Sequence, residues 1–275
     1  MKTKLIRALV SLLAIGMLVS FISLNKLKHK PKWKLTWKDE FNYEGLPDST
    51  KWNYDTGGEG WGNDELQYYT KQRKQNVEVL KGNLSIKAIR EKFEANNYTS
   101  TRLVTKGKKD FRYGKFEIRA KIPTGRGLWP ACWMLSSKEP RIWPDDGEID
   151  ILENVGYTPG EITGAAHVRR NKTSNAIITS SNSTTIFDAS DAFHIYRLIW
   201  TPERLEWYVD DKLFHFYDKA DRPPLHWPFN GKFYLIFNLA VGGSWGGKNG
   251  IDDSIFPQTF IIDYVRVYED QNLSS

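Results

Sequence analysis

Alternation of apolar and charged residues with a period of two is the feature that most restricts the fold of this chain. It is complete between Tyr113 and Pro123, as a strand with one buried face requires. The apolar set is Phe116, Ile118, Ala120 and Ile122, and the charged set is Lys115, Glu117, Arg119 and Lys121. Beyond Trp33 such runs are short, clusters of Gly, Asn, Asp and Pro separate them, and a helical period is hardly seen. The pattern predicts an all-β chain.

Further strands are predicted where similar runs recur. They are residues 83–89, 195–201, 205–209, 212–216 and 260–268, with a hairpin turn at Asp210-Asp211. Residues 233–241 are apolar almost throughout, which predicts a central strand covered on both faces. The sequence has no repeat of solenoid or propeller period and no long linker. These features favour one sandwich or jelly-roll domain, whose concave sheet can hold a groove for a polymer.

The positive charge of the chain lies at its start. The formal net charge is +6, and seven basic residues precede Trp33 without an acidic residue among them. They are Lys2, Lys4, Arg7, Lys26, Lys28, Lys30 and Lys32. Subtracting these seven charges from +6 leaves −1 for the rest of the chain. A nucleic-acid-binding domain would be basic itself, so we expect no nucleic-acid partner.

Residues 8–24 follow the basic start and are apolar apart from serines and one glycine. This is the layout of a signal peptide or a short membrane anchor, near the lower length limit for spanning a bilayer. No clear Ala-x-Ala cleavage site follows. We therefore expect an exported protein that is secreted, periplasmic or tethered to a membrane through residues 8–24. Residues 1–32 would be the signal or anchor, and residues 33–275 a single domain.

Three acidic residues lie within six positions of a predicted strand and alternate with apolar residues, which is unusual for a solvated run of charges. They are Glu148, Asp150 and Glu153. Strict alternation places the first two on one face of the strand and Glu153 on the other. All three share a face only if a β-bulge lies near Ile151-Leu152.

Converging carboxyls raise one another's pKa and can leave one group protonated beside an ionised one. Glycoside hydrolysis needs this mixture, and a retaining mechanism needs two carboxyls roughly 5 Å apart. Same-face positions on one bulged strand suit that spacing better than the wider gap of an inverting enzyme. The spacing alone also fits an exposed acidic strand, a divalent-cation site or chance.

The segment from Trp143 to Gly156, WPDDGEIDILENVG, resembles the active-site signature of glycoside hydrolase family 16 in its laminarinase-like (endo-β-1,3-glucanase) branch. Further agreement lies, in order, at residues 37–42, 61–70, 113–119, 127–135 and 263–268. The resemblance implies a jelly-roll β-sandwich with a glycan cleft on its concave sheet. It also implies Glu148 as the nucleophile, Glu153 as the general acid and then base, and Asp150 as the partner that holds and tunes the nucleophile.

The same resemblance implies six substrate-binding residues. They are Asn63, Arg102, Trp129, Trp133, His167 and Trp245. Tryptophan faces suit the apolar faces of sugar rings, although Trp129 and Trp133 would also suit a sandwich core. Asn63 is alternatively a turn residue and His167 a structural histidine. The sequence departs from the family pattern at Thr101, where a glycine is common, and at residues 168–170.

The resemblance also implies a structural calcium ion and no cofactor for catalysis. Its ligands would be the main-chain carbonyl groups of Glu40 and Gly82 and the side chain of Asp263, because a hard cation prefers oxygen. An ordinary surface carboxylate is the alternative for Asp263.

The expected function is endo-hydrolysis of β-1,3-glucan, with mixed-linkage β-1,3-1,4-glucan as a second substrate, by a monomer whose partner is the polysaccharide. Other members of the family act on agarose or carrageenan or transfer glycans. The basic pair Arg169-Arg170 leaves a sulfated polymer as an alternative substrate, because an enzyme for such a polymer would be expected to gather basic residues in its cleft. A β-glucan-binding protein without catalysis is a further alternative. Such a protein would be expected to lack one of the two catalytic glutamates, and both are present.

Overall fold

The computed structural model describes residues 30–169, 177–220 and 227–272 of the chain. It divides into two compact units, one of residues 35–269 and one of residues 1–34 with 270–275. The expected signal peptide or anchor, including the apolar stretch 8–24, falls largely outside the described residues, so the boundary after residue 32 stays a prediction. Within the described part of the chain, no helix is both long and apolar enough to cross a membrane.

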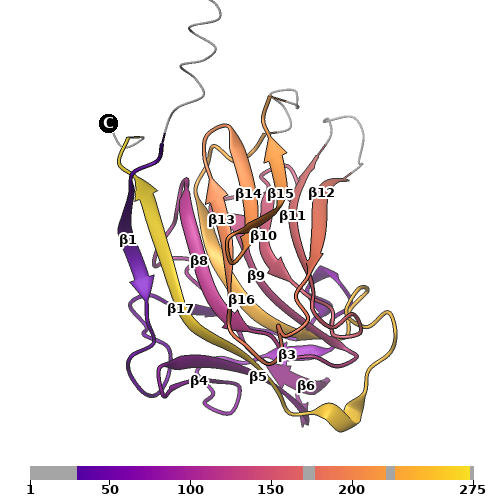
Figure 1. Ribbon diagram of the computed structural model, residues 1–275. Helices are drawn as coiled ribbons and strands as arrows, with labels where there is room; N and C mark the ends of the chain where they lie inside the picture. The colour runs from indigo at the N-terminus through magenta and orange to yellow at the C-terminus, as the bar shows by residue number, and fades with distance from the viewer. Residues whose placement is uncertain (1–29, 170–176, 221–226, 273–275) are drawn as a thin grey trace, which may run out of the picture. The chain divides into compact units, whose positions relative to one another are not determined.

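Strands account for nearly all regular structure in the described residues (Figure 1). The larger of two sheets has ten described strands. Its main order is β15 (Lys212–Asp218), β14 (Arg204–Val209), β13 (His194–Trp200), β8 (Gly114–Lys121), β17 (Gln258–Asp270), β5 (Asn83–Phe93), β6 (Asn96–Ser100) and β3 (Gln67–Tyr69). In addition, β1 (Trp33–Asp39) pairs with β17, and β4 (Val77–Leu80) pairs with β5.

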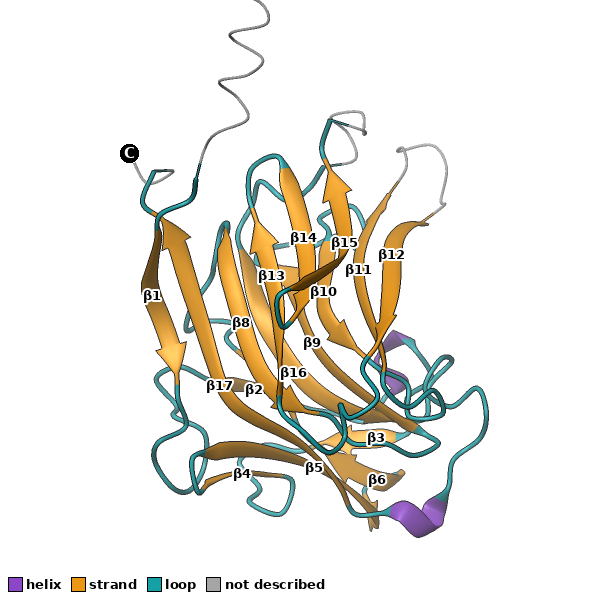
Figure 2. Cartoon of the chain, in the orientation of Figure 1, coloured by secondary structure: helices purple, strands orange, loops and turns teal. Residues whose placement is uncertain are grey.

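The second sheet has seven strands among the described residues and carries the acidic run. Its order is β12 (Ile177–Thr185), β11 (Glu161–Arg169), β10 (Glu148–Glu153), β9 (Leu128–Ser136), β16 (Phe233–Val241), β7 (Arg102–Val104) and β2 (Asn53–Asp55). Helical structure in the described ranges is limited to the short 3₁₀ turns η1 (Gly60–Gly62) and η3 (Asp253–Ile255) (Figure 2). The expected all-β class is therefore confirmed.

Each predicted strand is present, and the hydrophobic core lies between the two sheets. On β8 the alternation places Phe116 and Ile118 in this core, fully buried. All nine residues of β16 are buried, which confirms a central strand covered on both faces. The hairpin between β14 and β15 turns at Asp210, whose φ of 53° is the positive value that a tight hairpin turn requires.

Candidate active site

Strand β10 contains a β-bulge between Asp150 and Glu153. Asp150 pairs with Trp133 of β9, and Glu153 pairs with Ala131 of the same strand. Strand β10 therefore advances three residues where β9 advances two, so it holds one extra residue. This shift returns Glu153 to the face that carries Asp150 and Glu148.

Apolar side chains on the opposite face explain the bulge. Ile149, Ile151 and Leu152 are at most 1% exposed and all belong to the core between the sheets. Strict alternation cannot bury two consecutive residues on one side, whereas an extra residue allows it. The buried Trp207 of β14 donates a hydrogen bond of 2.7 Å from Nε1 to the main-chain oxygen of Asp150, where the bulge begins. The bulge expected at Ile151-Leu152 is confirmed.

The carboxylate of Glu148 contacts a tryptophan and a histidine. Trp143 donates a hydrogen bond of 2.9 Å from Nε1 to Oε2 of Glu148, and Nε2 of His167 lies 3.9 Å from Oε1. The hydrogen bond from Trp143 and the neighbouring His167 both lower the pKa of Glu148 and so favour its ionised form. Trp143 belongs to the signature segment, but its contact with Glu148 depends on the path of the preceding loop and was not expected from the sequence.

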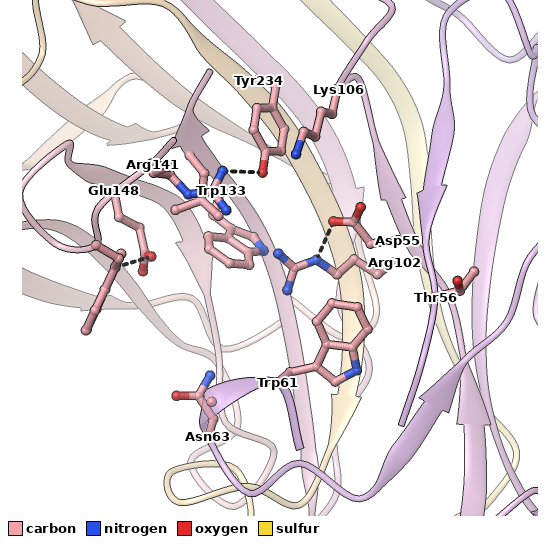
Figure 3. A pocket seen from close by; sticks show the side chains of 13 residues that line it. Asp55, Thr56, Trp61, Asn63, Arg102, Lys106, Trp133, Arg141, Glu148 and Tyr234 are labelled. Carbon is pink, nitrogen blue, oxygen red and sulfur yellow. Dashed lines mark hydrogen bonds and ion pairs between the residues drawn. The ribbon is translucent and has the colours of Figure 1, made fainter. Parts of the chain in front are cut away.

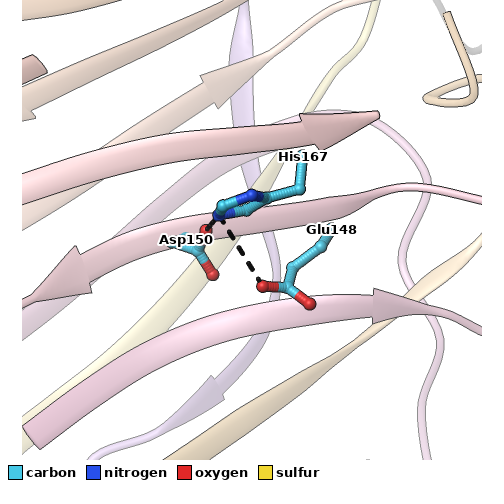
Figure 4. Close-up of side chains that lie close together, drawn as sticks. All are labelled: Glu148, Asp150 and His167. Atoms are coloured by element: carbon cyan, nitrogen blue, oxygen red, sulfur yellow. Dashed lines mark ion pairs between the residues drawn. The ribbon is translucent and has the colours of Figure 1, made fainter. Parts of the chain in front are cut away.

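His167 of β11 faces Asp150 and Glu148 (Figure 4). Its Nε2 lies 3.0 Å from Oδ2 of Asp150, and its Nδ1 lies 2.9 Å from the hydroxyl of Thr179. Among the described residues this Oδ2 has no hydrogen-bond partner of good geometry, so it can hold a proton. Donor atoms of Glu148, Asp150 and His167 all lie within 4.8 Å of one another, a grouping that a divalent cation could also use.

Glu153 contacts a tryptophan that packs against a second one. Trp129 donates a hydrogen bond of 3.0 Å from Nε1 to Oε1 of Glu153. The ring of Trp245 packs edge-on against Trp129, with ring centroids 5.4 Å apart and an interplanar angle of 80°. The loop that carries Trp245 is joined to the segment that carries Asn63 by a hydrogen bond of 2.7 Å from Ser244 N to the main-chain oxygen of Asn63.

Burial is the main cause of raised pKa values in the three carboxyls. It raises the pKa of Glu148 to about 8, with help from the charge of Asp150 and opposition from His167, Trp143 and Arg102. Burial also raises the pKa of Asp150 to about 8, against a hydrogen bond from Glu148. The pKa of Glu153 is raised well above its ordinary value by burial and then by the charges of Asp150 and Glu148. The triad therefore retains protons at neutral pH, as acid catalysis requires.

A cavity of about 530 Å³ opens beside Glu148 and is lined by three of the predicted substrate residues (Figure 3). They are Asn63, Arg102 and Trp133. The guanidinium group of Arg102 lies between the rings of Trp61 and Trp133, 4.8 and 4.7 Å from their centroids. Its Nε donates a hydrogen bond of 3.2 Å to Asp55. Trp129 contacts Glu153 instead, Trp245 packs against Trp129, and His167 lies beside Asp150, so the six predicted residues are divided around the carboxylates.

The family model of the glycosyl hydrolases family 16 matches residues 64–266. The chain belongs to glycosyl hydrolase family 16. A β-glucanase from Rhodothermus marinus is 45% identical to it over 275 residues, which cover 96% of this chain and 95% of the relative.

Solved members of family 16 have the same fold. The X-ray structure of the laminarinase from Rhodothermus marinus matches with a TM-score of 0.83 and 47% identity, covering 88% of this chain and 99% of that one. A non-specific endo-β-1,3(4)-glucanase of the family matches with a TM-score of 0.80 and 40% identity, over 88% of this chain and 95% of that one. The expected family, jelly-roll fold and glycoside-hydrolase class are confirmed.

A buried carboxylate that the sequence did not single out connects the cavity residues of this family 16 domain. Glu65 is 8% exposed and accepts hydrogen bonds from Asn63 Nδ2 at 3.1 Å and from Tyr69 OH at 3.2 Å. Asn238 in turn donates to Tyr69 OH at 3.0 Å and accepts from Trp133 Nε1 at 2.7 Å. This chain of hydrogen bonds joins Asn63 to Trp133 and fixes both side chains at the cavity.

The residues expected to bind calcium fit that ion poorly. Asp263 supplies the only side-chain ligand of the predicted set, and its carboxylate pairs with the guanidinium group of Arg119. The carboxylate of Glu40 is likewise engaged, by Arg266 at 2.8 and 2.9 Å. Two guanidinium groups add positive charge where a cation would need negative charge. Calcium binding by Glu40, Gly82 and Asp263 remains an untested prediction that these contacts do not favour.

The raised pKa values predict that the domain loses stability as the pH rises. Between the ordinary carboxyl pKa and about 8, the folded state holds protons on the triad that the unfolded state has released, so stability falls across this window. Asp150→Asn removes one such group while keeping its shape. At pH 8 we expect the Tm of Asp150→Asn to exceed that of the parent by about 2–4 °C for each kcal/mol of unfavourable burial that the substitution removes. At pH 4.5 the difference in Tm should be smaller.

Thermal unfolding at the two pH values checks this expectation. Asp211→Asn is the matched control, since the side chain of Asp211 is 97% exposed and lies in the β14–β15 turn. A Tm for Asp150→Asn that falls equally at both pH values would contradict the expected protonation of the triad.

Proposed function

We propose that the chain is a retaining endo-hydrolase of β-1,3-glucan that takes mixed-linkage β-1,3-1,4-glucan as a second substrate. The observation that carries the proposal is the bulge in β10, which brings Glu153 to the same face as Glu148, and Glu148 lines the cavity. Glu148 and Glu153 lie on the same face of one strand with Asp150 between them, and carboxyls gathered on one face suit the short spacing of a retaining mechanism. The relatives described as laminarinase and as non-specific endo-β-1,3(4)-glucanase support this choice of polymer.

In the first step, Glu148 attacks the anomeric carbon while Glu153 donates its proton to the departing glycosidic oxygen. The bond from carbon to that oxygen breaks, and an ester between the sugar and Glu148 forms with inverted configuration. In the second step, Glu153 takes a proton from water, whose oxygen attacks the same carbon and releases Glu148. Two inversions give net retention. The raised pKa of Glu153 suits it to begin the cycle protonated.

Asp150 allows Glu148 to be ionised although burial raises the pKa of both groups. If Asp150 holds the shared proton, the like charge beside Glu148 disappears and a hydrogen bond from the protonated acid can stabilise the Glu148 carboxylate. The hydrogen bond from Trp143 favours the same state. Asp150 thus acts through Glu148 rather than on the sugar directly.

The cavity and the tryptophans give the polymer a path past the carboxylates. Trp133 and Arg102 lie on the Glu148 side, and Trp129 and Trp245 lie on the Glu153 side. Exposed indole faces stack on pyranose rings, and contacts on both sides of the cleavage point suit attack within a chain rather than at its end.

The proposal is tested by incubating the full chain with laminarin, lichenan, agarose and carrageenan and measuring new reducing ends. We expect the highest rate on laminarin, a lower rate on lichenan, and products several sugars long from the start. Glu148→Gln should abolish release from both polymers. A folded parent that binds one polymer but cleaves none would leave glucan binding as its function, and faster release from carrageenan would refute the choice of substrate.

We also propose that the enzyme is exported as a monomer, with residues 1–32 as its signal or anchor and the apolar residues 8–24 as a tether if they are retained. The basic start and the apolar stretch support this. Leu13→Arg interrupts that stretch, and we expect it to keep glucanase activity inside the cell. Equal export of Leu13→Arg and parent would contradict the assignment.

A further inference from the structure

One arginine of the cavity makes its direct polar contacts with neutral oxygens, and among the described residues the nearby Glu139 acts on it only through space. Arg141 is partly buried, and its Nη1 donates hydrogen bonds to two neutral oxygens, Tyr234 OH at 2.9 Å and Ser136 O at 3.3 Å. Among the described residues no carboxylate lies within ion-pair distance of it. The other arginine of the cavity, Arg102, is paired with Asp55 at 3.2 Å. A partly buried charge without a counter-ion in direct contact is costly, which makes Arg141 a candidate for binding an anion.

A second cation lies next to Arg141. Figure 3 shows Lys106 and Arg141 approaching the hydroxyl end of Tyr234 at one end of the cavity. Lys106 pairs with Glu139 at 2.9 Å, but both side chains are largely open to water, and such exposed pairs are weak. Lys106 can therefore exchange Glu139 for a ligand at little cost.

The position of this pair relative to Glu148 follows from the strand register. Tyr234 of β16 pairs with Leu135 of β9, and Leu135 pairs with Glu148 of β10. Tyr234 therefore lies two strands from Glu148, about 10 Å across the sheet. An anion held beside the Tyr234 hydroxyl, where Arg141 donates, would lie in the same cavity as Glu148 and be carried by the same bound polymer.

We propose that Arg141 and Lys106 form a subsite for an anionic substituent of the glycan, a sulfate ester or a carboxylate, carried by a sugar beyond the one that Glu148 attacks. The proposal rests on the glucanase function above and deepens it. The planar fork of an arginine matches two oxygens of a sulfate or carboxylate, and a neighbouring lysine adds a mobile charge. Neutral glucan fills the same cavity without using this charge.

The test compares kcat/KM of the full chain on laminarin, lightly sulfated laminarin and lightly carboxymethylated laminarin, at low and at high salt. We expect the parent to prefer at least one modified polymer at low salt and to lose this preference at high salt. Arg141→Met keeps the length of the side chain and should lower the ratio of modified to neutral activity by about tenfold. The sulfated and carboxymethylated arms show which anion fits.

Arg112→Met is the matched control because it removes the same charge from an exposed arginine that lies outside the cavity lining. It should keep the parent ratio. Should Arg141→Met fail to fold, Arg141→Lys retains the charge and should keep part of the preference. Parent activity that is lower on both modified polymers, or an equal change of ratio in both methionine variants, would overturn the subsite. Failure of the parent to cleave neutral laminarin would instead overturn the proposed function and the subsite with it.

Discussion

Replacement of Glu148 by alanine is expected to lower kcat on laminarin by roughly four orders of magnitude or more, as losses of catalytic nucleophiles do. The side chain supplies the carboxylate that forms the covalent intermediate, and Trp143 and His167 are placed to stabilise its ionised form. Water cannot take its place on the same face of the sugar without a base there. Initial rates of reducing-end release measure the loss.

Rescue by a small anion distinguishes a variant that is inactive because it lacks its nucleophile from one that is inactive because it is unfolded. With an aryl β-laminaribioside that has a good leaving group as substrate, azide should restore the activity of Glu148→Ala. The product should be the α-glycosyl azide, because one direct displacement inverts the anomeric carbon. Glu161→Ala, at an exposed position on the neighbouring strand, should keep the parent rate. The Tm of Glu148→Ala should equal or exceed that of the parent, since its raised pKa marks a group that the folded state accommodates at a cost. A β-azide from this variant would contradict the role of Glu148.

Replacement of Glu153 by alanine is expected to lower kcat on laminarin by about 10²–10⁴-fold, the usual contribution of a general acid and base. The loss should depend on the leaving group. An aryl glycoside whose phenol is acidic needs no proton to depart, so its first step should remain fast and the covalent intermediate should accumulate. A burst of released phenol followed by slow turnover is the measurement.

The product of azide rescue and the pH profile distinguish Glu153 from Glu148. Azide should attack the intermediate in Glu153→Ala and give the β-glycosyl azide, by two inversions. Because burial raises the pKa of Glu153 well above its ordinary value, its acid form persists to higher pH than that of an ordinary carboxyl, and the alkaline limb of kcat/KM should disappear in the variant. Equal losses on laminarin and on the activated glycoside, with the alkaline limb retained, would show that Glu153 is not the acid.

The strands of this fold were predictable because their signal is local. In β8, buried Phe116 and Ile118 alternate with charged residues, and in β16 every residue is buried. The bulge was predictable for a related reason. Strict alternation puts Glu153 on the face opposite Glu148 and Asp150, so the hypothesis of converging acids required an extra residue near Ile151 and Leu152.

Local sequence patterns do not predict contacts between segments that are distant in the sequence. Arg102 lies between Trp61 and Trp133 because the η1 turn, β7 and β9 meet at the cavity, and no periodicity reports such a meeting. The chain of hydrogen bonds from Glu65 to Trp133 likewise passes through β3 and β16. From the sequence alone, Glu65 would be expected at the surface like most glutamates, and only the structure shows that it is buried.

The partners of charged residues also depend on contacts that sequence patterns do not report. Asp263 has the oxygen that a calcium site needs, and its pairing with Arg119 on the adjacent strand is such a contact. Arg169-Arg170 was the expected basic feature for a sulfated polymer, yet Arg170 lies outside the described residues. Arg141, which the sequence did not single out, lies in the cavity itself. Its position depends on the loop before β10 and not on a strand pattern.

The most direct test of the account is the anomeric configuration of the first product. Proton NMR of laminarin oligosaccharides, recorded within seconds to minutes of adding the full chain and before mutarotation, distinguishes the α and β forms of the new reducing end. Double displacement by Glu148 and Glu153 predicts that the β anomer appears first and the α anomer grows only by mutarotation. An α anomer that appears first would contradict the retaining mechanism and the assignment of Glu148 as nucleophile.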